Sequence, residues 1–398
     1  MQTHKLVSVT SVLATSLLLG TGAAASEQSL QNQVDALTRQ VQALSREATT
    51  PDRATSKWHL SGYMDAGLVI TDSDTEEDHF ASGHFNPAFH FQYSDRVFFE
   101  SELEIETEDD GSTHMAIEYN AVNVILGDRA TLVVGKWLSP VGQFQERLHP
   151  SWINKMASAP VGFGHGGIQP LSDIGVQVRG AVPMGGTYFT YAVAVGNGPQ
   201  GGHHGLELEG FSEDNNSDKS FHGRLGFFPM NDLEIGVSYM QASAPGEEAD
   251  TGPITDGDFD LFGADVAFTR GSWDIRAEYL DAELSSFYGR EHHGDVTTSL
   301  IPSTDWTAWY AQLAYRIPEM NWEPAIRVGD LDIEGHFGGG EGVGSVDVGV
   351  NYWIAPSATF RVGVQRLSFD ETGVDDETLV RLQFAYGFSR GGRFVMKT

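Results

Sequence analysis

Apolar and polar residues alternate along most of the chain from Trp58 onward, and the alternation recurs in segments of about ten residues. The clearest segment covers 96–106, where apolar side chains occupy one face and glutamates occupy the other. Because successive side chains of a β-strand point to opposite faces, a period of two predicts strands with one apolar face. No helical period persists in this part of the chain, so we predict an all-β fold.

The alternating segments predict sixteen strands, and an even number is typical of single-chain bacterial membrane barrels. We place these strands near 58–70, 83–93, 96–106, 113–125, 129–136, 172–182, 186–196, 219–229, 233–242, 258–269, 272–283, 306–317, 322–331, 343–353, 357–367 and 377–388. No segment after residue 25 approaches the ~20 apolar residues that a membrane helix requires, so any membrane span must belong to a barrel.

The connections between the predicted strands differ in length in a regular way. Connections after even-numbered strands are short, as at Ser94-Asp95 and Gly271, whereas those after odd-numbered strands are mostly long and polar, as at 197–218 and 284–304. Outer-membrane barrels have short periplasmic turns and long extracellular loops, and a soluble sandwich has no reason to segregate its loops in this way. We therefore predict a 16-stranded antiparallel transmembrane β-barrel over residues 58–398, with both ends of the chain in the periplasm.

The N-terminal part of the chain predicts export and a short helix. Residues 1–25 combine Lys5, an apolar stretch and a small-residue cleavage site, as a signal peptide does. Residues 26–48 carry Leu and Val at alternating steps of four and three, which predicts a periplasmic coiled-coil helix, and 49–57 predicts a linker. Val at a and Leu at d favour a dimer of this helix. The expected location is the outer membrane of a Gram-negative bacterium.

Composition narrows the classes of function. The 398 residues carry a formal net charge of −31 and include no cysteine. Nucleic acid would repel such a chain, so no nucleic-acid partner is expected. The pairs His203-His204 and His292-His293 lie in long loops without a third ligand, and we predict neither a metal site nor a cofactor.

The longest connection, residues 137–171, differs from the other long loops because it is rich in Trp, Pro and Gly rather than in acidic residues. A connection of this length without a strand is usually functional. It is also the third predicted extracellular loop, and we expect it to fold into the lumen and narrow it. Its charged candidates for this constriction are Glu146, Arg147, His149 and Lys155.

Charged residues on the face opposite the apolar one are predicted to line the lumen. An arginine on the lipid face would cost ~2–4 kcal/mol near the bilayer midplane, which favours an inward position for strand arginines. The arginines assigned to the lumen are Arg179, Arg224, Arg276, Arg327, Arg361 and Arg381. The carboxylates assigned to the facing wall are Glu100, Glu102, Glu104 and Glu118. As a set they predict a charge filter, and the alternative is ordinary solvated residues with local Arg–Glu pairs.

The segment Val133-Val134-Gly135-Lys136, followed by Pro140-Val141-Gly142 and Glu146, resembles the GxxxxPxG segment of the phosphate-selective porin O/P family. The N-terminal seam followed by Leu60-Ser61-Gly62-Tyr63 is similar to the stalk and first strand of that family. The resemblance implies a trimeric, substrate-filtering channel. Family members that bind phosphate use many loop lysines and arginines, whereas this chain has 24 Lys and Arg in total.

The expected function is passive diffusion of small hydrophilic solutes or ions through an outer-membrane porin, filtered by a lumen arginine wall that faces carboxylates. An anion- or phosphate-specific channel is the first alternative. A structural or adhesive barrel, or the sheath of an electron conduit, is an alternative of another class. The expected partners are two further copies in a homotrimer, membrane lipid and lipopolysaccharide, and we do not expect an enzyme.

Overall fold

A computed structural model describes residues 55–73, 77–81, 83–107, 111–165, 167–202, 205–208, 210, 217–244, 255–289, 299–335, 341–371 and 373–395. The predicted signal peptide, coiled-coil helix and most of the linker lie outside the described residues, as do both histidine pairs. Within the described part of the chain, no helix has the length and apolar character needed to cross a membrane.

The barrel strands are β1 (Thr55–Thr71), β3 (Phe85–Gln92), β4 (Val97–Thr107), β5 (Thr113–Gly127), β6 (Ala130–Leu138), β7 (Ser172–Met184), β8 (Thr187–Gly196), β11 (Ser220–Met230), β12 (Leu233–Ala244), β13 (Gly257–Arg270), β14 (Trp273–Leu284), β17 (Thr304–Tyr315), β18 (Trp322–Gly335), β19 (Glu341–Ala355), β20 (Ala358–Phe369) and β21 (Glu377–Val395). Shorter elements are β2 (His79–Ala81), β9 (Gln200–Gly202), β10 (Gly205–Glu207), β15 (Phe287–Gly289), β16 (Ser299–Ile301) and one π-helical turn, η1 (Phe144–Leu148). These bounds agree with the predicted strands to within a few residues, except at the C-terminal end of β21.

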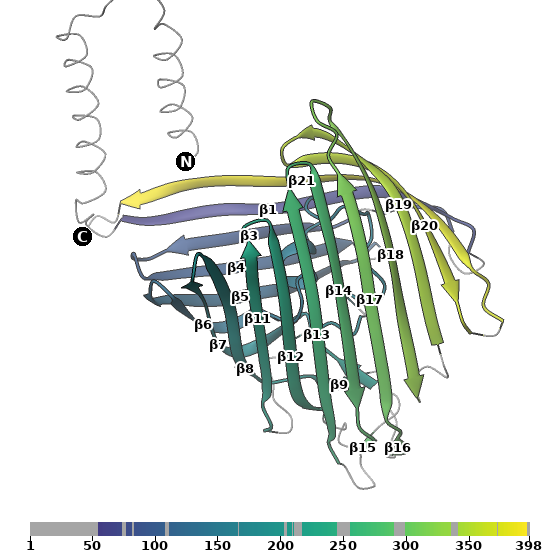
Figure 1. Cartoon of the computed structure of the whole chain (residues 1–398), viewed down its shortest axis with the longest axis horizontal. Coiled ribbons are helices and arrows are strands. Elements are labelled where there is room, and N and C mark those ends of the chain that lie inside the picture. The colour runs from purple at the N-terminus through teal and green to yellow at the C-terminus, as the bar shows by residue number, and fades with distance from the viewer. Residues whose placement is uncertain are drawn as a thin grey trace, which may run out of the picture. The chain divides into compact units, whose positions relative to one another are not determined.

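The sheet closes on itself. Each barrel strand pairs antiparallel with its neighbour along the chain, and β21 pairs with β1 from Thr55↔Val395 to Thr71↔Leu379. Figure 1 shows these two strands side by side, purple against yellow. The short strand β2 is the seventeenth strand of this sheet. It pairs only with residues Gly67–Val69 of β1, beyond the end of the pairing between β1 and β3. The predicted 16-stranded antiparallel barrel is therefore confirmed.

The last strand is longer than the alternation predicted. The sequence placed its end near residue 388, but β21 continues to Val395 and keeps its register with β1. Strand β20 pairs with β21 only as far as Tyr386, so Ser389 and the residues after it pair on one side alone. The residues after Phe388 therefore extend the closing seam.

Alternating exposure separates the two faces of the wall. On β19, Val346 and Val348 are 49% and 53% exposed, whereas Ser345 and Asp347 are 4% and 3% exposed. The exposed face is apolar, as expected for contact with lipid. The covered face is polar over most of the strands, and its side chains therefore point into the barrel.

The pattern inverts where β13 and β14 approach their long loops. Leu261, Leu280 and Leu284 are buried, whereas Asp258 and Glu283 on the alternate positions are exposed. The buried side chains form one apolar core inside the barrel with the segment that connects β6 to β7, through Val141, Phe144, Leu148, Phe163 and Ile168. Apolar side chains on the inner face therefore hold that segment against β12–β17.

Candidate functional site in the barrel interior

The segment between β6 and β7, residues 139–171, is here named the inserted loop. It contacts strands far apart in the closed sheet: Ser238 on β12 accepts a hydrogen bond of 3.2 Å from the loop, and Asn351 on β19 donates one of 3.0 Å to it. Glu102 on β4 lies 3.8 Å from a loop histidine. A segment that reaches all three strands crosses the interior of the barrel.

A buried Ser–His–Asp cluster lies at the root of the inserted loop, where its first and last residues leave strands β6 and β7. His222 on β11 lies 3.3 Å from Ser139 Oγ through Nδ1 and 3.1 Å from Asp173 Oδ2 through Nε2, and Ser220 also donates to Asp173. These residue types make up hydrolase triads. Here His222 and Ser139 are 0% exposed, so no substrate reaches them. The cluster instead ties both ends of the loop to β11.

Beyond the root, Glu278 on β14 accepts the backbone N–H groups that open η1. Its two carboxylate oxygens accept hydrogen bonds of 3.1 Å from the N–H of Gln143 and of Phe144. Gly142 precedes them with φ +67°, and a Cβ there would lie 1.6 Å from Glu278 Oε1. The left-handed backbone and the close carboxylate explain why this position of the Pro-Val-Gly segment is glycine.

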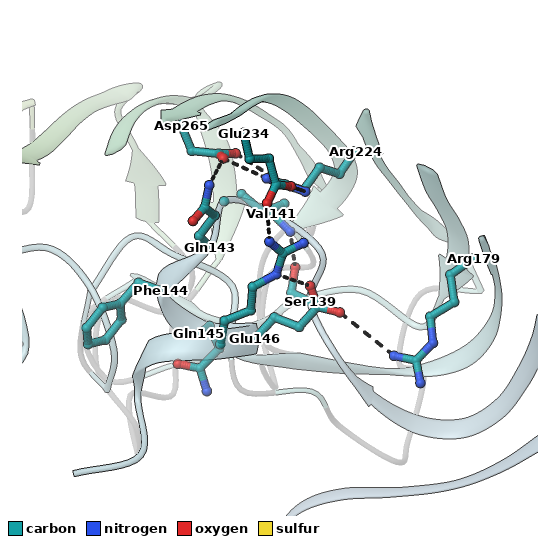
Figure 2. Close-up of polar contacts among 12 residues, drawn as sticks. Ser139, Val141, Gln143, Phe144, Gln145, Glu146, Arg179, Arg224, Glu234 and Asp265 are labelled. Carbon is teal, nitrogen blue, oxygen red and sulfur yellow. Dashed lines mark hydrogen bonds and ion pairs between the residues drawn. The ribbon is translucent and has the colours of Figure 1, made fainter. Parts of the chain in front are cut away.

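Figure 2 shows how side chains of the loop meet the wall at β11–β13. Gln143 donates to Asp265 on β13, and Arg224 on β11 donates to the same carboxylate at 2.6 Å. Arg224 also donates to Glu234 on β12 at 3.0 Å. Each of its three guanidinium nitrogens therefore donates to a carboxylate, and only 4% of its side chain is exposed.

Two charged residues of η1 reach in different directions. Arg147 pairs with Glu234 at 2.5 Å, and Glu146 lies 3.8 Å from Arg179 on β7. Arg179 also donates to Glu100 on β4 at 3.2 Å, and 37% of its side chain is exposed. Arg179 therefore connects the loop to Glu100 of β4, and the dashed line in Figure 2 marks its contact with Glu146.

Arg327 and Arg361, on β18 and β20, are buried against the middle of the loop. Arg327 donates to Asp347 at 3.2 Å, to Ser158 O at 3.0 Å and to Ala159 O at 3.0 Å. Arg361 donates to the backbone oxygens of two further loop residues, Met156 and Asn154, each at 2.6 Å. Nearby, Lys155 of the loop pairs with Glu323 at 3.1 Å.

The other two predicted arginines contact fewer loop atoms. Arg276 on β14 donates to Asp274 at 2.8 Å and to Gln143 at 3.3 Å. Arg381 on β21 donates to Gln365 at 2.5 Å. We name Arg224, Arg276, Arg327 and Arg361 the arginine anchors, because each of them holds the inserted loop directly or through Gln143 and its carboxylate partner.

The opposite wall carries a group of carboxylates without such anchors. Their side chains face the loop from β1, β4 and β5, and we name them the acidic wall: Asp65, Glu102, Glu104, Glu106 and Glu118. Four of the five, all but Glu106, are no more than 6% exposed. Among the residues that the structure describes, none of the five forms an ion pair with a lysine or arginine; their recorded charged partners are histidines.

All three of these histidines lie in connections rather than in strands, and two of them have shifted pKa values. The nearby Asp65 carboxylate, 3.6 Å from Nδ1, raises the pKa of His84 above its ordinary value. Burial disfavours the charged ring of His149, but the carboxylates of Glu102 and Glu118 outweigh burial and raise the pKa of His149 as well. Both rings therefore gain protons more readily than a free histidine and add positive charge to the acidic wall.

A cavity of about 900 Å³ lies beside the loop at this wall. Its lining includes three carboxylates, two histidines and a single arginine, namely Asp65, Glu77, Glu106, His79, His84 and Arg381. Ala157 contributes a loop residue to the same lining. Among the groups that line this cavity, the carboxylates therefore outnumber the single arginine.

Sequence reasoning missed most of the carboxylates that pair with the arginines. Asp265, Glu278 and Asp347 lie at buried, inward positions of strands β13, β14 and β19, so alternation alone could have identified them. His222 and Asp173 were missed for another reason, because strands separated along the chain bring them together. Their juxtaposition depends on the register of β7, β8 and β11.

A closed sixteen-stranded barrel with an apolar outer face, a polar interior and an inserted loop defines an outer-membrane channel protein. A family model for Gram-negative porins matches residues 12–372. The chain therefore belongs to the Gram-negative porin family, and it is a passive-diffusion channel of the outer membrane. The expectation of a channel rather than an enzyme agrees with this family.

Solved structures share the fold at low sequence identity. The anion-selective porin from Comamonas acidovorans is 10% identical with a TM-score of 0.58, and the match covers 84% of this chain and 100% of that one. The outer membrane channel DcaP of Acinetobacter baumannii is 13% identical with a TM-score of 0.57, covering 85% and 99%. OmpT of Vibrio cholerae is 14% identical with a TM-score of 0.56, covering 84% and 98%. No curated protein matches the chain.

Proposed function

We propose that this porin prefers small hydrophilic cations and that they pass between the inserted loop and the acidic wall. The observation that carries the proposal is the lack of arginine or lysine partners at the acidic wall among the described residues. Carboxylates without arginine or lysine partners give a narrow channel a negative interior field that attracts cations and repels anions, because low surrounding polarity weakens screening. The acidic lining of the adjacent cavity supports the same preference.

The predicted arginine filter takes a different role in this proposal. Arg224, Arg327 and Arg361 are at most 5% exposed, and their donors are occupied by carboxylates, amide oxygens or loop carbonyls. A guanidinium whose three nitrogens all donate to oxygens of the protein has few N–H groups left for a passing anion. The arginine anchors therefore position the loop, and of the six predicted arginines Arg179, Arg276 and Arg381 remain candidates for contact with solutes.

A second candidate is an anion-selective channel of the phosphate-selective O/P type. It is supported by the resemblance of the segment from Gly135 to Gly142 to that family, and by Arg381 at the cavity. One of the structures with the same fold is described as an anion-selective porin. We rank this candidate second because the cavity lining holds three carboxylates and a single arginine.

We propose a homotrimer as the assembly, with the exposed apolar faces outside the subunit contacts surrounded by lipid and lipopolysaccharide. One OmpT structure with the same fold is described as a trimer form. The predicted helix at 26–48 would then join three copies in the periplasm, although its Val and Leu pattern favours two. Crosslinking of the folded protein, followed by mass determination, distinguishes trimer from dimer.

The test of ion preference is a reversal-potential measurement in a planar bilayer with a KCl gradient. We expect a potential of the sign that K⁺ preference gives, and a smaller potential for the double variant Glu102→Gln/Glu118→Gln. Glu283→Gln is the matched control, because this carboxylate is exposed on the outer side of β14. A potential of the opposite sign in the unmodified protein would establish the anion-selective candidate instead. Absence of conductance would favour a structural barrel.

A further inference from the structure

His84, Glu104 and Glu106 lie close together at the end of the acidic wall where the short strand β2 pairs with β1. His84 forms an isolated backbone bridge with Glu106, which fixes its position against β4. Its Nε2 lies 3.5 Å from Glu106 Oε1 and 4.0 Å from Glu104 Oε1. These three ligand atoms all lie within 4.8 Å of one another, which is the separation expected of groups that can hold one cation.

The other side of the His84 ring faces Asp65. The Asp65 carboxylate lies 3.6 Å from Nδ1, its side chain is only 6% exposed, and its Oδ2 has no hydrogen-bond partner. A carboxylate behind a histidine ring is the usual arrangement at metal sites, because it fixes the tautomer that leaves the opposite nitrogen free to coordinate. The buried, unpartnered Asp65 oxygen is thus an observation separate from the clustering of the ligands.

The backbone next to His84 is also shaped for this contact. Gly83 has φ +64°, and a Cβ at this position would lie 2.1 Å from the Asp65 carbonyl oxygen. The Asp65 N–H donates to His84 O at 3.1 Å. Only glycine fits so close to β1, and it brings the imidazole and the carboxylate together.

A second group of ligands shares Glu104 with the first. His165, from the inserted loop, lies 3.6 Å from Glu104 Oε1 and 3.3 Å from Glu118 Oε1 through Nε2. These three residues also lie within 4.8 Å of one another. The cavity of about 900 Å³ is lined by His84 and Glu106, so a hydrated ion has access to the first group.

We propose that His84, Glu104 and Glu106 bind a late first-row divalent cation such as Zn²⁺, and that Glu118 and His165 extend the site to the inserted loop. Zn–N and Zn–O distances of about 2.0–2.2 Å place neighbouring ligand atoms about 3.3–3.6 Å apart in a tetrahedron. The histidine–carboxylate separations of 3.3–4.0 Å are close to this geometry, and all ligand atoms of each group lie within 4.8 Å of one another. Imidazole nitrogen selects such a cation over Ca²⁺ and Mg²⁺, which prefer oxygen ligands alone.

Calorimetric titration of ZnCl2 into the folded, chelator-stripped protein in detergent tests the site. All variants are made in a background in which the two loop histidine pairs are alanine, so that these pairs add no heat. We expect His84→Ala to weaken binding at least tenfold, and Asp65→Asn to weaken it by about 10–100-fold as for other residues behind a metal ligand. His79→Ala is the matched control, since His79 lines the same cavity and lies outside the cluster.

Equal binding by His84→Ala and His79→Ala would overturn the proposal, as would displacement of Zn²⁺ by an equal concentration of Ca²⁺. Glu106→Gln provides a second variant if His84→Ala fails to fold, because 40% of the Glu106 side chain is exposed. Loss of single-channel conductance on addition of Zn²⁺, absent in His84→Ala, would support an ion bound beside the passage. Calorimetry measures binding without current, so the metal site and the proposed cation preference fail independently.

Discussion

On the side of the barrel formed by β11–β20, arginines of the wall meet carboxylates or loop oxygens, whereas on β1, β4 and β5 the carboxylates meet mainly imidazoles. Arg224 and Arg327 exemplify the first side, with donors filled and almost no exposure. Glu104 exemplifies the second, with His84 and His165 as its ion-pair partners among the described residues. The comparison teaches that inward charges of opposite sign differ in their partners here: the arginines fasten the inserted loop, whereas the acidic wall has no lysine or arginine partner among the described residues.

The largest effect is expected from removing an arginine anchor. Arg327→Met leaves the buried carboxylate of Asp347 and two loop carbonyls without their donor. Loss of one partner of a buried ion pair costs about 3–5 kcal/mol. We expect the midpoint of urea unfolding, followed by the mobility of folded and unfolded barrel on a gel, to fall accordingly.

The double variant Arg327→Met/Asp347→Asn sharpens this result. It removes the uncompensated charge as well as the guanidinium, so part of the lost stability should return. Equal stability of Arg327→Met and the unmodified protein would show that the arginine side does not fasten the loop.

An intermediate effect is expected where the loop meets Glu278. Gly142→Ala places a methyl group against a carboxylate in a left-handed backbone conformation. Overpacking of this kind costs about 1–3 kcal/mol. We expect lower stability together with altered single-channel conductance, because the start of η1 must move.

Gly185→Ala is the matched control, because it introduces a side chain at a left-handed backbone position without a steric clash. Gly185 has φ +60° in a turn, and a Cβ there meets nothing within 4 Å. We expect this control to lower stability slightly and to leave conductance unchanged. Equal conductance changes in both alanine variants would contradict a specific contact between Gly142 and the wall.

A smaller effect is expected from pH on the acidic side. The folded-state pKa of His149 is raised, so its favourable pairing with Glu102 and Glu118 is complete below the ordinary histidine pKa of about 6.5 and is lost as pH rises through the higher folded value. Its positive charge disappears over the same interval. We therefore expect cation preference, measured as reversal potential, to increase as pH rises above about 6.5.

His149→Asn tests whether this ring is the responsible group, because the pKa of His84 is raised in the same direction. We expect the variant to lose part of the pH-dependent change in reversal potential. An identical pH profile in the variant would remove His149 from the explanation.

The smallest effect is expected at the exposed pair Arg366–Asp376, separated by 2.8 Å with side chains 54% and 40% exposed. Exposed pairs of this kind contribute about 0–1 kcal/mol. Arg366→Met should shift the urea midpoint little and leave the ion preference unchanged. A fall in the urea midpoint as large as that of Arg327→Met would show that the arginine anchors stabilise the barrel no more than an exposed arginine does.

The barrel was predictable from the sequence because alternation and loop length are local properties. Strands such as 96–106 and the short turn at Ser94-Asp95 show both signals directly. The assumption that the apolar face always meets lipid was wrong near the long-loop ends of β13 and β14. There Leu261 and Leu280 point inward, because they pack against the inserted loop.

The partners of the predicted site residues could not be read from the sequence. Alternation placed Arg361 on an inner face, but its donors go to the backbone of Asn154 and Met156. Those contacts depend on the path of the loop, which no periodic pattern encodes. The pairing of His84 with Glu104 and Glu106 was equally hidden, since it follows from the irregular insertion of β2 beside β1.

The seam between β1 and β21 has a consequence for how the molecule folds. All other neighbouring barrel strands follow one another along the described chain, whereas the seam joins Val69 to Arg381 and Thr55 to Val395. The entropy of closing so long a chain must be overcome before these pairs form, so the seam is expected to be the slowest contact to appear. Until then β1 and β21 each present an open edge, and the extended register of β21 adds length to the edge that closes last.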